Sequence, residues 1–103
     1  MNEMVAYEAA PAIGADQARV NITYAGSNGD LPDPVSFQAA DGDVKTWVSE
    51  ALRTGGVPGI PAVEADLRDF VVDRFPATAE IPLNRLFLRP KTPFGLTTMF
   101  LLP

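Results

Sequence analysis

The sequence predicts an α+β fold in which one helix covers one face of a mixed sheet of four to five strands. Short segments of alternating apolar and polar residues, a single helical stripe of apolar residues, and proline and glycine clusters between them all favour this fold. With 103 residues the chain has room for one domain, since two halves would bury too little surface to fold. We expect a flexible arm over residues 1–17, the folded domain over 18–90 and a tail over 91–103.

The first two strands are expected to form a hairpin. Residues 19–24 alternate, with Val20, Ile22 and Tyr24 on one face, and residues 35–38 alternate in the same way. Between them stands Asn28-Gly29, a pair that tolerates the positive backbone angles of a tight turn. We therefore expect the chain to reverse at this pair.

One helix is expected to start at Asp41, a good N-cap residue, and to end at Gly55 and Gly56, which supply a left-handed stop. Its apolar stripe consists of Val44, Trp47, Val48, Ala51 and Leu52. Because Trp47 belongs to this stripe, we expect its side chain to lie between the helix and the sheet.

Two further strands complete the predicted sheet. Residues 67–74 also show helical spacing, but Val71 and Val72 are stiff at χ1 and Pro76 closes the run, which favours a strand over 70–75. Residues 85–89 read as another buried strand, ended by Pro90. This element order lets the first and last strands lie side by side in the middle of the sheet, which is a β-grasp arrangement.

Composition excludes several classes of function. The net charge is −5 and no basic run is longer than two residues, so we expect no nucleic-acid partner. No apolar run is long enough to cross a bilayer, and we expect no membrane association and a cytoplasmic location. Without histidine or cysteine the chain lacks the usual general bases, thiol nucleophiles and transition-metal ligands, so we expect no enzyme, no metal and no cofactor. The acidic pairs Asp41/Asp43 and Asp30/Asp33 fit solvated turns better than catalysis.

The hairpin, the helix sequence DGDVKTWVSEAL and the final strand resemble ubiquitin and its relatives over residues 19–95. In that family the last strand continues into a basic, extended tail that ends in glycine, and this chain has LFLRPKTPFG in that place, at residues 86–95. The resemblance is closest to bacterial ubiquitin-like proteins encoded beside activating, conjugating and deubiquitinating homologues, a setting tied to antiphage defence. It implies a protein modifier, made as a precursor, whose partners are activating and conjugating enzymes, a processing peptidase and target proteins.

The resemblance also implies roles for residues of the tail. Cleavage between Gly95 and Leu96 would leave a glycine carboxylate, which has no side chain to hinder activation. Arg89, Lys91 and Phe94 would contact the handling enzymes. Lys45 and Lys91 are the candidate acceptors for a second copy, because the chain has no other lysine.

Two departures from the family leave alternatives open. Phe94 stands where typical members have a second glycine, and the apolar segment LTTMFLLP, residues 96–103, follows Gly95. This segment could be a discarded propeptide or an extra edge strand. In the second case the chain would be a protein-binding module with an uncleaved tail. A sulfur-carrier protein is a lesser alternative, because those proteins depend on a Gly-Gly end.

Overall fold

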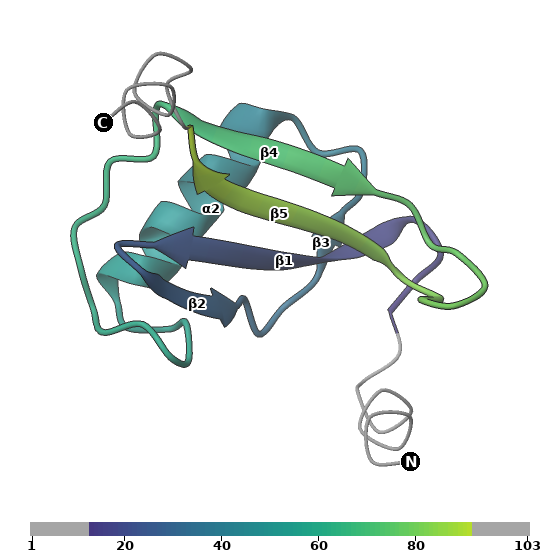
Figure 1. The fold of residues 1–103 in the computed structure, drawn as a ribbon, viewed down its shortest axis with the longest axis horizontal. Helices are drawn as coiled ribbons and strands as arrows, with labels where there is room; N and C mark the ends of the chain where they lie inside the picture. Colours follow the sequence, from purple (N-terminus) through teal and green to yellow (C-terminus); the bar gives the residue numbers. More distant parts are fainter. Residues whose placement is uncertain (1–12, 92–103) are drawn as a thin grey trace, which may run out of the picture.

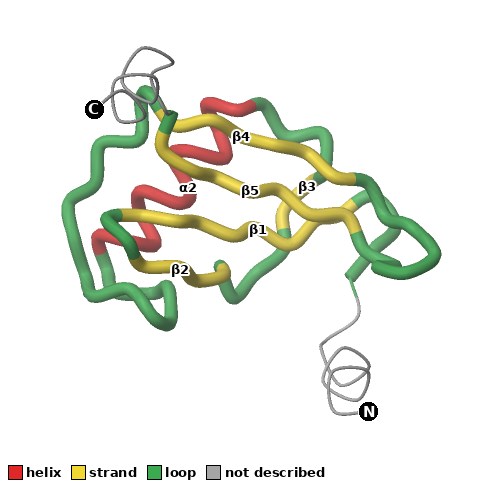
Figure 2. The backbone as a smooth tube through the Cα atoms, viewed as in Figure 1, coloured by secondary structure: helices red, strands yellow, loops and turns green. Residues whose placement is uncertain are grey.

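The computed structural model describes residues 13–91, which form one helix and a five-stranded sheet (Figure 1). The elements in chain order are β1 (Gln17–Tyr24), β2 (Ser27–Asp30), β3 (Val35–Ser36), α2 (Asp41–Arg53), β4 (Phe70–Phe75) and β5 (Asn84–Pro90). The α+β class with a mixed sheet and one helix is thereby confirmed. Much of the described chain outside these elements is loop and turn, as Figure 2 shows.

The sheet has the order β2-β1-β5-β4, and β3 pairs with the start of β1. The two central strands, β1 and β5, are parallel, whereas β2, β3 and β4 pair antiparallel with their neighbours. The first and last strands therefore lie side by side in the middle, as predicted. The predicted strand over 70–75 is also confirmed as β4.

The core lies between the sheet and α2. Alternate residues of the central strands face the helix and are buried, and α2 contributes Val44, Val48 and Leu52 at a spacing of four. The inward residues of the two central strands are Ala18, Val20, Ile22, Leu86 and Leu88. Figure 1 views the sheet from its other side, with α2 behind it, and we call this uncovered surface the open face.

The prediction of a turn at Asn28-Gly29 is wrong. The chain reverses at Ala25 and Gly26, whose φ angles are 52° and 85°, and Asn28 and Gly29 lie within β2. The glycine meets a packing need instead, because a Cβ at Gly29 would lie 2.4 Å from the carbonyl oxygen of Pro58. A loop therefore backs closely onto β2, and only glycine leaves room for it.

The second expected strand, over 35–38, is much shorter in the structure. It is reduced to β3, which pairs with Gln17 and Ala18 at the start of β1. The hairpin partner of β1 is β2, which the alternation of apolar residues could not reveal because its sequence, SNGD, contains none.

The helix has the predicted extent, but two details differ. Ala40 occupies the N-cap position without a side-chain hydrogen bond, and Asp41 is the first helical residue, paired with Arg74 of β4. The left-handed stop is at Gly55, with φ of 74°, as predicted.

The prediction that Trp47 is a core residue is wrong, since it is 43% exposed. Trp47 lies at the margin of the stripe defined by Val44, Val48 and Leu52. It lies beside the connection from β2 to β3, where β3 has only two residues, so no long strand covers it.

Candidate functional site

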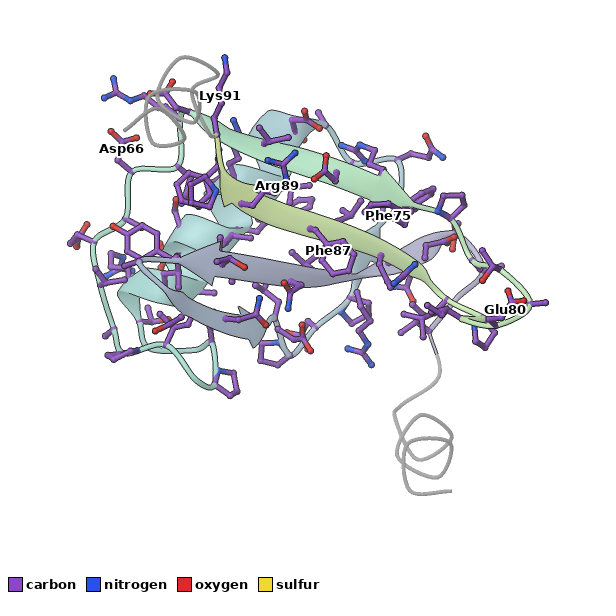
Figure 3. The ribbon with its side chains drawn as sticks, viewed as in Figure 1. Asp66, Phe75, Glu80, Phe87, Arg89 and Lys91 are labelled. Carbon is purple, nitrogen blue, oxygen red and sulfur yellow. The ribbon has the colours of Figure 1, made fainter. Side chains whose placement is uncertain are left out.

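The site that the sequence predicts begins at the end of β5, where the tail leaves the domain. Arg89 is anchored there, because its Nε donates a hydrogen bond to Oδ2 of Asp73 on β4 at 2.7 Å. Lys91 is exposed and makes no ion pair within residues 13–91. Figure 3 shows Arg89 over the open face and Lys91 extending away from the end of the sheet. The two basic residues of the tail therefore differ: one is fixed and the other is available.

Phe94, Gly95 and Leu96 lie outside the described residues, as do residues 1–12. The structure therefore places the base of the tail but not the predicted cleavage position. Gly95 follows Lys91 by four positions, so extended chain could carry it up to about 14 Å from there.

The open face carries a cluster that the sequence reasoning missed, formed by Phe75 of β4 and by Arg85 and Phe87 of β5. The two ring centroids are 5.3 Å apart in an edge arrangement, and the guanidinium carbon of Arg85 lies 5.5 Å from each centroid. Figure 3 shows both phenylalanines on this side of the sheet. We call these three residues the Phe75 cluster.

Arg85 has unusual surroundings for a cation. Its Nε is buried and has no hydrogen-bond partner, whereas every other arginine of residues 13–91 donates to a carbonyl or carboxylate oxygen. The two aromatic rings hold the guanidinium by cation–π attraction instead. Its terminal N–H groups make no hydrogen bond within residues 13–91 and could meet an incoming acceptor, whereas the buried Nε–H could not.

Two more arginines extend this basic character across the open face. Arg19 of β1 is the register partner of Arg85, and Arg89 lies four positions further along β5. The open face thus carries three arginines, of which Arg89 is paired with Asp73 on the same face. The sequence held one signal for this: Arg85, Phe87 and Arg89 alternate with the buried Leu86 and Leu88, so all three face the opposite side.

The two candidate acceptor lysines differ in availability. Lys45 on α2 is half-buried, and its Nζ donates to the carbonyl oxygen of Arg68 at 2.9 Å. Lys91 is exposed at the end of β5. A reaction at the Lys45 amine would first have to break its hydrogen bond, so Lys91 is the more accessible acceptor.

The acidic residues do not converge on one point. Asp41 pairs with Arg74, and Asp30 accepts a hydrogen bond from Asn21. The pKa shifts arise at exposed ion pairs: a hydrogen bond from Arg53 lowers the pKa of Glu50, and one from Arg68 lowers that of Asp66. Within residues 13–91 no group of three or more acidic side chains could hold a metal ion. No helix in this part of the chain is long and apolar enough to cross a membrane.

Comparison with known proteins identifies no relative: no family model matches the chain, and neither a curated protein nor a solved structure is significantly similar to it.

Proposed function

We propose that this chain is a β-grasp, ubiquitin-like protein modifier. A peptidase trims it after Gly95, an activating enzyme adenylates the new carboxylate, and the activated glycine is then joined to an amine of a target protein. The bacterial antiphage setting implied by the sequence resemblance is part of the proposal.

The observation that carries the proposal is the position of β5. It is a central strand, paired with β1 on one side and β4 on the other, and its last residues lead directly into the basic tail. A modifier needs a rigid body for enzymes to grip and a tail that reaches beyond it. The ion pair between Arg89 and Asp73 ties the end of this strand to β4. The exposed Lys91 begins the part of the chain that an enzyme would thread.

The Phe75 cluster supports the same proposal, because it offers a surface that the handling enzymes could bind. Phe75 is 42% exposed, and aromatic rings with a nearby arginine are typical of the centre of protein–protein interfaces. The cluster lies toward the start of β5 and the tail leaves from its end, so an enzyme that handles the tail would have to reach along the open face to contact the cluster.

The test uses the chain ending at Gly95, the full-length chain and the cognate activating and conjugating enzymes with ATP. We expect the shortened chain to form a covalent conjugate, seen as a mass gain on the target of the shortened chain minus one water. The full-length chain should react only after peptidase treatment.

Gly95→Ala in the shortened chain should slow this reaction, because the added methyl group crowds the reacting carboxylate. Leu96→Ala in the full-length precursor is the matched control, since that residue is discarded. An inert shortened chain in the presence of active cognate enzymes would contradict the proposal.

The second candidate function is a binding module whose tail is never cleaved, and the Phe75 cluster favours it as well. It predicts that Phe75→Ala abolishes partner binding. It also predicts that the chain lacking residues 96–103 forms no covalent conjugate with a target. Intact mass of the protein isolated from its own cells distinguishes the two: a chain ending at Gly95 supports the modifier, and an uncleaved chain supports the module.

A further inference from the structure

A groove on the helix side of the domain has no role in the function proposed above. It lies between α2 and the connection from β2 to β3, has a volume of about 450 Å³, and is lined by Leu31, Pro32, Asp33, Pro34, Val35, Trp47, Glu50 and Ala51. We call it the Trp47 groove. The exposed Trp47 and the two prolines line it together, so the groove offers apolar surfaces to an incoming chain.

The ionisable side chains that line the groove have one sign, although Arg19 donates to the backbone carbonyl oxygen of Pro32 at 2.9 Å. Asp33 and Glu50 contribute the only ionisable side chains among its lining residues, and both are acidic. Arg53 pairs with Glu50 but does not line the groove. Asp33 is exposed and makes no ion pair within the described part of the chain. An unpaired carboxylate and an exposed tryptophan therefore line the same groove.

This combination selects a cation. Tryptophan is the aromatic residue that attracts cations most strongly, and a carboxylate at the same groove adds charge attraction. Arginine and lysine also carry long apolar stems that can pack on proline rings while the charged head reaches the carboxylate. A purely apolar side chain would leave Asp33 facing apolar surface, and an acidic one would be repelled.

We propose that the Trp47 groove binds a basic side chain, flanked by apolar residues, on an extended segment of a partner protein. The proposal does not depend on cleavage at Gly95, because the groove lies on the helix side of the sheet. One partner could therefore occupy this groove while another holds the open face.

Trp47 is the only tryptophan of the chain, so its fluorescence reports directly on the groove. The probe is the peptide acetyl-Ala-Leu-Arg-Leu-Ala-amide, titrated into the full-length protein. The matched probe replaces its arginine by citrulline, which keeps the shape and removes the charge. We expect a saturable change in emission with both probes and a Kd about 2- to 5-fold weaker for the citrulline peptide.

Substitutions locate the effect. Asp33→Asn should weaken binding of the arginine peptide about 2- to 5-fold and abolish most of its preference over citrulline. Asp69→Asn, the same change at an exposed residue outside the groove, should leave the Kd unchanged. Added salt should reduce the difference between the two peptides, since the carboxylate is exposed to solvent.

Three results would overturn the proposal. The first is equal affinity for the two peptides, which would make the groove merely apolar. The second is an equal effect of Asp33→Asn and Asp69→Asn, which would place the peptide elsewhere. The third is an emission that does not change at millimolar peptide, while the amide signals of Leu31 and Val35 also stay fixed in an NMR titration.

Discussion

Asn84→Asp tests the way in which β5 is fastened to the start of β1. Asn84 is the buried polar residue of the described domain, 8% exposed, and its side-chain amide nitrogen donates to residues 67 and 69 positions away. Its Nδ2 donates to the carbonyl oxygens of Ala15 and Gln17, both at 2.9 Å, and its Oδ1 accepts from the amide of Ala77 at 2.8 Å. A carboxylate can keep the third bond but has no proton for the first two.

The expected cost at neutral pH follows from these contacts. Each lost hydrogen bond contributes about 0.5–1.5 kcal/mol, and the new charge would face two carbonyl oxygens in a buried place. We expect the free energy of unfolding to fall by about 3–5 kcal/mol, the range found when a buried charge is left unpaired. That is a large part of the stability of a domain of this size.

The loss should depend on pH with a definite sign. Burial and the two carbonyl oxygens raise the pKa of the introduced carboxyl above its unfolded value of about 3.9. A raised folded-state pKa means that the deficit is smallest below the unfolded pKa and grows as pH rises through the folded one. The neutral acid can also donate to one of the carbonyl oxygens, which reduces the deficit further.

Urea unfolding of the variant and the wild type at pH 7 and near pH 4 measures this difference. Gln38→Glu is the matched control, because it makes the same amide-to-acid change at an exposed side chain. Equal costs for the two variants, or a deficit of Asn84→Asp that does not shrink on acidification, would show that Asn84 is not placed between those carbonyls.

Three other perturbations probe separate parts of the structure. Trp47→Ala should cost about 1–2 kcal/mol, less than the ~3–5 kcal/mol of a fully buried aromatic residue, because 43% of the residue is exposed and no closed cavity forms; a larger loss in urea unfolding would return it to the core. Gly29→Ala should destabilise by about 1–3 kcal/mol in thermal melts, since its methyl group would overlap the carbonyl oxygen of Pro58, and a neutral result would refute that close approach. Arg53→Gln should raise the pKa of Glu50 toward its ordinary value in an NMR titration, removing a stabilisation that is present above the ordinary pKa and lost as pH falls through the depressed one; an unmoved pKa would show that the pair does not form in solution.

Some residues of the candidate site could be predicted from local sequence, whereas others depend on contacts between distant parts of the chain. The sequence could place Arg89 and Lys91 at the start of the tail because the final strand and its proline mark where that tail begins, and the family resemblance then suggested their role. The Phe75 cluster could not, because it requires the register that sets Phe75 opposite Arg85 across β4 and β5. The fixed state of Lys45 likewise depends on a carbonyl in a loop 23 residues away.

What the sequence determined by itself is the type and position of β1, α2, β4 and β5, from periodicity in β1 and α2 and, for β4, from β-branched residues and a closing proline. Alternation and the helical stripe are local properties, and they also identify the inward faces of β1 and β5, so the pairing of these strands in the centre followed from element order and burial. Only the tertiary structure decided the turn position and the exposure of side chains where a neighbouring strand is short or polar. The prediction misplaced the turn because β2 contains no apolar residue, and the chain in fact reverses at Ala25 and Gly26. Trp47 is exposed because β3 ends after two residues. A periodic pattern shows which way a side chain points, but the length and register of the neighbouring strands decide whether anything covers it.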